Sequence, residues 1–154
     1  MSLSIGDKAP DFTLPTDGAG TVSLAGFKGK KVILYFYPKD DTPGCTKEAC
    51  GFRDALPDFD GSGAVVIGLS KDSVARHDKF KAKHALPFTL AADVDGSVTE
   101  AYGCWVEKSL YGKKYMGIDR ATFLIDGDGI LRGIWHKVKV DGHVDAVLKA
   151  AQAL

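Results

Sequence analysis

Two cysteines five residues apart, Cys45 and Cys50, are the side chains best suited to redox chemistry in this sequence. Cys45 follows a Thr-Pro-Gly turn (residues 42–44) and stands at the predicted start of a helix. Unpaired N–H groups and the positive end of the helix dipole stabilise a thiolate at such a position. Because the thiolate is the nucleophilic and oxidisable form of cysteine, we favour Cys45 as a nucleophile over the alternative of a small buried filler.

The residues before Cys45 suit the same chemistry. Gly44 lets the backbone approach a small substrate closely, and the Thr42 hydroxyl can turn toward the sulfur or toward a bound oxygen. The order strand, polar loop, helix start is also where α/β domains place their sites. These features indicate a functional cysteine at position 45.

Cys50 poses a geometric problem. In an unbroken helix the Cα atoms of residues five apart are about 8.6 Å from each other, whereas a disulfide needs less than about 7 Å. Either the two sulfurs never join, or the segment from Cys45 to Cys50 unwinds when they do. The second alternative would couple the redox state to local unfolding.

Metal sites are not expected, nor is a cofactor. A structural zinc site needs four ligands at tight paired spacings, and no second Cys or His pair accompanies the two cysteines. Asp126–Gly129 is too short for an EF-hand loop and is typical of a hairpin turn. The four histidines are interpreted as solvated helix-face or surface residues: His77, His84, His136 and His143.

Composition narrows the class of protein. Lys plus Arg equals Asp plus Glu at 20 each, so the chain as a whole has no electrostatic attraction to nucleic acid or to an anionic membrane. No apolar run approaches the roughly 20 residues of a membrane span, and residues 1–11 do not resemble a signal peptide. We therefore expect a cytoplasmic protein. Three cysteines make a disulfide scaffold improbable, and Cys104 is expected to be a small buried residue.

The 154 residues predict one domain, spanning 1–154. The continuous apolar run Val32–Tyr37 predicts a central strand covered on both faces, which Pro38 ends. A helix is predicted from Thr42 or Pro43 to Leu56, just before Pro57, with Thr42 as its cap.

The remaining pattern alternates strands and helices. The predicted elements are short extended pieces within Ala9–Leu24, a strand at Val65–Leu69, a helix from Ser70 to His84 capped near Ser70 or Asp72, a strand after Phe88, a hairpin of Ala121–Ile125 with Ile130–Trp135, and an amphipathic helix over Gly142–Leu154. This order predicts an α/β, thioredoxin-like fold with a central mixed sheet flanked by helices and an N-terminal β extension.

Pro38, Thr42 and Cys45 stand in the pattern Pro-x3-Thr-x2-Cys, which resembles the active site of peroxiredoxins. The following residues 46–54, which include Cys50, resemble the subfamily known as bacterioferritin comigratory protein or peroxiredoxin Q. The resemblance continues in residues 6–12, 107–109 and 117–126 and so covers nearly the whole chain.

The resemblance implies a role for each matching residue. Cys45 would be the peroxidatic cysteine that becomes a sulfenic acid, and Cys50 the resolving cysteine that condenses with it. Thr42 would hydrogen-bond the peroxide and the sulfur, and Pro38 would shield the thiolate from water. Arg120 would lie close to Cys45, favour its thiolate and hold a peroxide oxygen.

The function implied is that of a thioredoxin-dependent peroxidase acting on hydrogen peroxide and organic hydroperoxides. Thioredoxin, less often a glutaredoxin, would reduce the disulfide, and the protein would be a monomer or less commonly a dimer. Cys104 is not part of the pattern, and Glu48 and Arg53 either support the site or form a solvated ion-pair face. Alternatives are a disulfide oxidoreductase, which the absence of Cys-x-x-Cys weakens, and a redox-sensing or chaperone-like binding protein.

Overall fold

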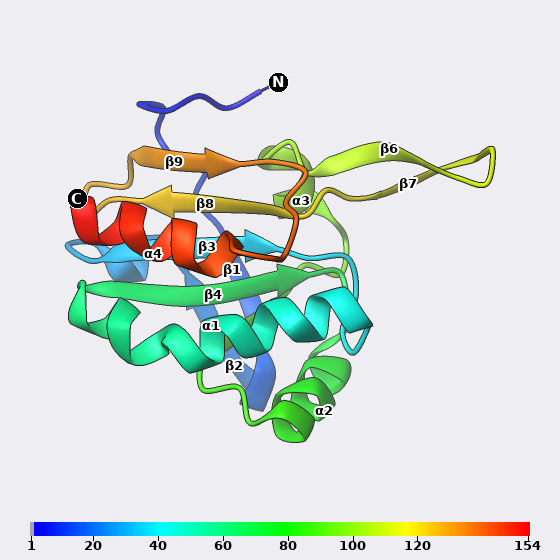
Figure 1. Cartoon of the computed structure of the whole chain (residues 1–154), viewed down its shortest axis with the longest axis horizontal. Helices are drawn as coiled ribbons and strands as arrows, with labels where there is room; N and C mark the ends of the chain where they lie inside the picture. The colour runs from blue at the N-terminus through cyan, green and yellow to red at the C-terminus, as the bar shows by residue number, and fades with distance from the viewer. Residues whose placement is uncertain (1) are drawn as a thin grey trace.

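The computed structural model describes residues 2–154, which form a seven-stranded sheet, a separate two-stranded sheet and four α-helices (Figure 1). The strand order in the large sheet is β2-β1-β5-β4-β3-β8-β9. Its strands are β1 (Thr13–Thr16), β2 (Gly20–Ser23), β3 (Lys31–Phe36), β4 (Ala64–Ser70), β5 (Thr89–Ala92), β8 (Ala121–Ile125) and β9 (Leu131–Trp135). Strands β3, β4 and β5 are parallel to one another; β8 pairs antiparallel with β3 and β1 with β5, and β9 pairs antiparallel with β8.

Strand β3 is the centre of this sheet, between β4 and β8. Val32, Leu34 and Phe36 belong to the buried cluster on one face, and Ile33 and Tyr35 to the cluster on the other. A run that is apolar at every position therefore suits a strand covered on both sides, as the sequence predicts.

The helices cover the two faces unequally. They are α1 (Pro43–Gly61), α2 (Val74–His84), α3 (Ser97–Ala101) and α4 (His143–Ala153), with short 3-10 turns at η1 (Asp17–Ala19) and η2 (Leu24–Phe27). Side chains of α1, α2 and α4 pack with Ile33 and Tyr35, while the N-terminal segment and α3 pack on the opposite face. The expected mixed sheet with flanking helices and an N-terminal β extension is confirmed.

Helix α1 is longer than the sequence predicts, because it continues through Pro57 to Gly61 rather than ending at Leu56. A proline inside a helix removes one hydrogen bond and crowds the preceding turn. The helix extends nonetheless because Phe59, in its last turn, is completely buried in the core. Tertiary packing thus outweighs the local cost of Pro57.

Helix α2 begins at Val74, four residues later than predicted, and its cap is Ser73 rather than Ser70 or Asp72. The Ser73 hydroxyl oxygen accepts the Arg76 N–H at 3.2 Å. Ser70 remains in strand β4, and its hydroxyl donates to Asp72 instead.

The hairpin of β6 (Trp105–Leu110) and β7 (Lys113–Ile118) was not predicted, and it extends away from the body of the molecule (Figure 1). Most of its residues are exposed, so its sequence lacks the alternation of a strand packed on a core. The available signal was Tyr111-Gly112, whose two positive φ angles form the tight turn. Helix α3 also escaped prediction, since its five residues are too few for a periodic pattern.

Two histidines were placed wrongly by the sequence. His77 is completely buried and His143 is 6% exposed, although both were interpreted as solvated. Each has a buried partner that is distant in the chain: His77 contacts Asp40, and His143 contacts the Thr122 hydroxyl. Burial lowers the pKa of His143 to about 4, aided by the Arg120 charge, so this ring is neutral at physiological pH.

Candidate active site

Cys45 lies at the carboxyl end of the parallel strands, as the third residue of α1. Its side chain is only 1% exposed. The N–H groups of the first helical turn have no acceptor within the helix, so the sulfur occupies a region of positive potential. The expected helix-start environment of Cys45 is confirmed.

Arg120 is the cation beside this sulfur. Its Nη2 donates to Cys45 Sγ at 3.3 Å. The pairing of Phe36 with Ala121 places the start of β8 beside the end of β3, which brings Arg120 to the active-site loop. A Cβ on Gly44 would stand 3.2 Å from the same Nη2, so glycine permits this close approach.

Glu48 is the second partner of Arg120, and the sequence left open whether it supports the site or belongs to a solvated ion-pair face. Arg120 Nη1 donates to Glu48 Oε1 at 2.7 Å. Burial raises the pKa of Glu48 to about 7, against the opposing effect of Arg120. Glu48 thus supports the site, one of the two alternatives left open, while Arg53 pairs with Asp54 and donates to the His84 carbonyl.

Thr42 occupies the N-cap position of α1, but its hydroxyl makes no capping bond. Oγ1 instead donates to the Lys39 carbonyl at 2.9 Å. A hydroxyl has one proton to give and two lone pairs to receive with. Because the Thr42 hydroxyl donates its proton to the hydrogen bond with the Lys39 carbonyl, it can act toward a further partner only as a hydrogen-bond acceptor.

Cys50 lies about one and a half turns after Cys45 on the same helix and is half-exposed. It lines an open hollow of about 610 Å³ between α1 and the start of α4, together with Val144 and Leu148. Both Cys45 and Cys50 are free thiols, so the structure represents the reduced protein with α1 intact. Cys50 is therefore the accessible sulfur of the pair.

Cys104 lies apart from both, completely buried among the apolar side chains on the opposite face of the sheet. Burial raises its pKa well above the ordinary thiol value, which keeps the sulfur protonated. The expectation of a small buried residue is confirmed.

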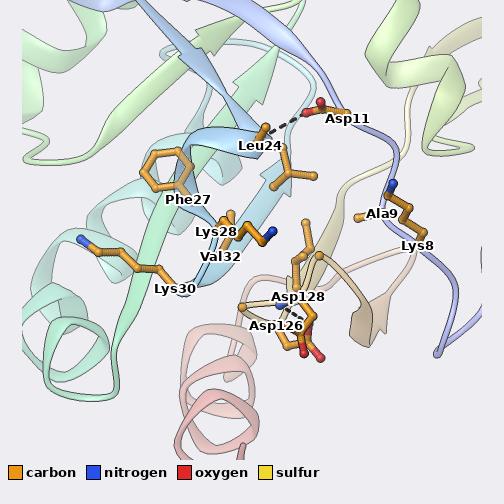
Figure 2. Close-up of a pocket in the computed structure, with 14 residues that line it drawn as sticks. Lys8, Ala9, Asp11, Leu24, Phe27, Lys28, Lys30, Val32, Asp126 and Asp128 are labelled. Atoms are coloured by element: carbon orange, nitrogen blue, oxygen red, sulfur yellow. Dashed lines mark hydrogen bonds between the residues drawn. The ribbon is translucent and has the colours of Figure 1, made fainter.

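A second hollow, of about 260 Å³, lies at the other end of the sheet (Figure 2). Val32 and Leu24 contribute to its apolar lining, and Lys8, Asp11 and Asp128 stand around it. Val32 is at the start of β3, whereas the loop to Cys45 follows the end of that strand. This hollow is therefore separate from the cysteine site.

Within residues 2–154, no group of three or more His, Cys, Asp or Glu side chains gathers where it could hold a metal ion. Over the same residues, no helix has the length and apolar character that crossing a membrane requires.

Known proteins have sequences similar to this one. The model of the AhpC/TSA family matches residues 5–134. Peroxiredoxin Bcp of Bacillus subtilis is 52% identical over 149 residues, which are 97% of this chain and 95% of that protein. A Coxiella burnetii protein provisionally named peroxiredoxin Bcp is 61% identical over 96% of this chain and 98% of its own.

Solved structures share the fold as well. The bacterioferritin comigratory protein of Xanthomonas campestris, studied for alkyl peroxide reduction, superposes with a TM-score of 0.88 at 44% identity, covering 92% of this chain and 90% of that one. A Cys-to-Ser mutant of Xylella fastidiosa PrxQ gives a TM-score of 0.94 at 36% identity, over 99% and 98% of the two chains. The thioredoxin-like class expected from the sequence is confirmed by these neighbours.

Proposed function

The chain belongs to the AhpC/TSA family and is a thiol peroxidase of the Bcp and peroxiredoxin Q type, and we propose that Cys45 is the sulfur that attacks the peroxide. The observation that carries this proposal is the 3.3 Å contact between Arg120 Nη2 and Cys45 Sγ at the start of α1. A fixed cation beside a desolvated sulfur favours the thiolate over the thiol.

In the first step the Cys45 thiolate attacks one oxygen of the hydroperoxide. The S–O bond forms as the O–O bond breaks, which leaves Cys45 as a sulfenic acid. The departing oxygen takes a proton and leaves as water or an alcohol. The Thr42 hydroxyl oxygen accepts a hydrogen bond from the peroxide O–H. The guanidinium of Arg120 stabilises the negative charge that develops on the departing oxygen.

Pro38 contributes by occupying the loop immediately after the buried end of β3. Its ring is half-buried and carries no N–H to hydrogen-bond water. Its role is to limit access of water to the sulfur, which keeps the electrostatic interaction between Arg120 and Cys45 strong.

In the second step the Cys50 thiol condenses with the sulfenic acid. An S–S bond forms between Cys45 and Cys50, and water leaves. A dithiol reductant then gives two electrons and two protons, which restores both thiols and leaves the reductant oxidised. We assign thioredoxin as this reductant, with glutaredoxin as the less favoured alternative, acting on a monomeric protein in the cytoplasm, where thiol pools are kept reduced.

Single-turnover mixing with one equivalent of hydrogen peroxide tests the assignment of the two sulfurs. Wild type should lose two thiols rapidly, Cys50→Ser should stop at a sulfenic acid that dimedone traps, and Cys45→Ser should be inert. Rapid consumption of peroxide by Cys45→Ser would overturn the role of Cys45.

The reductant is tested in a second assay. Thioredoxin, thioredoxin reductase and NADPH are added to the oxidised protein, and NADPH consumption is followed with peroxide in excess. Turnover should depend on thioredoxin; turnover with glutaredoxin and glutathione alone would reassign the reductant without touching Cys45.

A further inference from the structure

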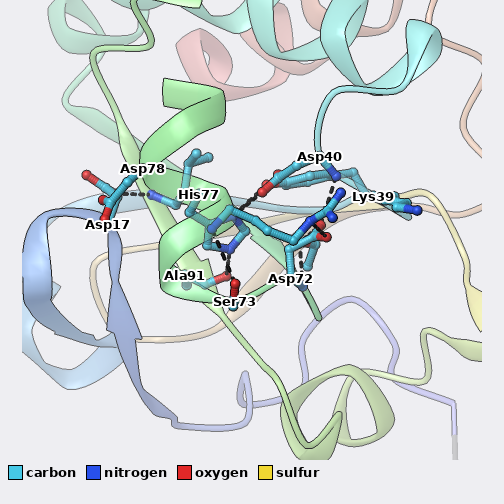
Figure 3. A network of polar contacts seen from close by, with 12 residues as sticks. Asp17, Lys39, Asp40, Asp72, Ser73, His77, Asp78 and Ala91 are labelled. Atoms are coloured by element: carbon cyan, nitrogen blue, oxygen red, sulfur yellow. Dashed lines mark hydrogen bonds and ion pairs between the residues drawn. The ribbon is translucent and has the colours of Figure 1, made fainter. Parts of the chain in front are cut away.

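The loop from Pro38 to Cys45 rests on α2 and on the residues that lead into it (Figure 3). Asp40 turns inward and is 3% exposed. Its carboxylate accepts the Tyr37 hydroxyl at 2.5 Å and meets His77 Nδ1 at 2.6 Å. None of these three residues takes part in the proposed chemistry.

His77 is itself fixed in orientation. Its Nε2 lies 2.9 Å from the Ala91 carbonyl, which can only accept, so Nε2 carries a proton. Burial acts to lower the pKa of His77, but the Asp40 carboxylate, the Ala91 carbonyl and the Asp72 charge together outweigh burial and the pKa is raised. The buried contact between His77 and Asp40 is therefore charge-assisted and holds the loop to α2.

The peptide unit between Lys39 and Asp40 links this network to the active site. Its N–H, from Asp40, donates to Asp72 Oδ2 at 2.8 Å. Its carbonyl, from Lys39, accepts the Thr42 hydroxyl at 2.9 Å. Because a peptide unit is planar and rigid, the carboxylate at one edge of the plane sets the direction of the carbonyl at the other.

Asp72 is well placed to act as this anchor. Its side chain is 8% exposed. The Ser70 hydroxyl donates to Oδ2 at 2.7 Å, and Arg76 Nε donates to Oδ1 at 3.0 Å. Both carboxylate oxygens are thus held by residues outside the loop, Ser70 of β4 and Arg76 of α2.

The backbone of the loop needs such an anchor at this point. Asp41 has a φ of +62°, a left-handed conformation that is uncommon for a residue other than glycine. Its carboxylate points outward to Lys83 and His84 at the end of α2. Local backbone preference alone would not favour this turn, which positions Thr42. The contacts of the Asp40 and Asp41 side chains with α2 hold it in place.

We propose that Asp72 is a positioning residue of the peroxidase reaction, which holds the Lys39–Asp40 peptide so that Thr42 gives its proton to Lys39 and keeps its lone pairs for the peroxide. The Asp40–His77 contact fixes the same loop residue through its side chain. This inference rests on the proposed role of Thr42. It implies that loss of Asp72 slows the step in which Thr42 acts and leaves reactions of Cys45 that do not need Thr42 unchanged.

The test uses full-length protein in a Cys50→Ser background, so that oxidation stops at the sulfenic acid. Two rates are measured on each variant: formation of the sulfenic acid with hydrogen peroxide, by rapid quench with dimedone, and alkylation of Cys45 by iodoacetamide. Asp72→Ala is compared with Asp72→Asn, whose amide oxygen can still accept the Asp40 N–H.

Asp78→Ala is the matched control. Asp78 stands on α2 and, like Asp72, accepts a backbone N–H, from Gly18 at 2.7 Å, but it does not touch the loop.

Asp72→Ala should lower the peroxide rate about tenfold, as expected for a misplaced catalytic group, with Asp72→Asn restoring most of it. The alkylation rate of Asp72→Ala should stay within about twofold of that of the parent. The same holds for the peroxide rate and the alkylation rate of Asp78→Ala. In a Thr42→Val background Asp72→Ala should have almost no further effect on the peroxide rate, because both changes remove the same interaction.

Three results would overturn the inference: an unchanged peroxide rate in Asp72→Ala, a parallel fall of both rates, or full additivity with Thr42→Val. If Asp72→Ala does not fold, the same comparisons are made with Asp72→Ser, whose shorter side chain cannot reach the Asp40 N–H. The parent and its Cys45→Ser variant are assayed first. If Cys45→Ser does not react with peroxide and Asp72→Ala reacts at the parent rate, only the role of Asp72 is refuted. The proposed function would then still hold.

Discussion

Cys45 and Cys50 lie on one uninterrupted helix, the first sulfur buried and the second half-exposed. Regular helix geometry separates their Cα atoms by about 8.6 Å, beyond the limit of about 7 Å for a disulfide. Between them, Glu48 and Ala49 are completely buried. Joining the two sulfurs therefore requires this turn of α1 to unwind, which would also separate Glu48 from Arg120.

Hydrogen exchange should report this unwinding. We expect the amides of residues 46–50 to be protected in the reduced protein and to lose protection in the disulfide form, because their helical hydrogen bonds are broken. Amides of α4 should keep their protection and serve as the internal control. Cys50→Ser treated with peroxide should stay protected; equal protection of residues 46–50 in the reduced and disulfide forms would contradict the remodelling.

Replacing Arg120 should slow the attack on peroxide. Arg120→Met removes the donor that contacts Cys45 and should lower the rate constant of sulfenic acid formation by about 100-fold. Arg120→Lys should be intermediate, because one ammonium group cannot reproduce the forked geometry that contacts Cys45 and Glu48 together. Stopped-flow measurements with hydrogen peroxide give these rates.

Arg132→Met is the control for this prediction. Arg132 is an exposed residue of β9 that pairs with Asp126 and has no contact with the site. The Arg132→Met variant should form the sulfenic acid at the wild-type rate. A wild-type rate in Arg120→Met would contradict the proposed role of Arg120.

Cys104 should be chemically silent. Because it is completely buried and burial raises its pKa, iodoacetamide should label it only after unfolding, which mass spectrometry of native and denatured samples can show. Cys104→Ala should keep full peroxidase activity and lose about 1 kcal/mol of unfolding free energy through the small cavity it leaves. Rapid native labelling of Cys104 would show that the segment around it opens readily.

Features encoded by neighbouring residues could be predicted from the sequence. The run that forms β3, the turn at Asp126–Gly129 and the spacing of Pro38, Thr42 and Cys45 each depend on residue types within a few positions of one another. Hydrophobic period and turn chemistry are sufficient to identify such features.

Features that depend on distant partners could not be predicted. Glu48 finds Arg120 72 positions away, and His77 finds Asp40 37 positions away. Nothing near either residue distinguishes it from a solvated side chain on a helix, because the partner is brought to it only by the order of strands in the sheet. Buried polar groups require such partners, so their assignment needs the tertiary fold.

Glu48 should make the stability of the fold depend on pH. Burial raises its folded-state pKa from 4.5 to about 7. A carboxyl with a raised pKa binds its proton more tightly in the folded state, so stability is lost as the pH rises from about 4.5 to about 7. The whole interval corresponds to at most about 3 kcal/mol.

Glu48→Gln should remove this dependence while keeping an oxygen that can accept from Arg120. The comparison is best made in a Cys45→Ser background, which prevents oxidation of that residue during unfolding. Denaturant unfolding at pH 5 and pH 8 should show Glu48→Gln gaining stability relative to its parent as the pH rises. Asp54→Asn is the control, because Asp54 is an exposed acid on the same helix whose ion pair with Arg53 is screened by solvent. A stability difference between Glu48→Gln and its parent that is the same at both pH values would mean that the Glu48 carboxyl ionises as readily inside the fold as in the unfolded chain.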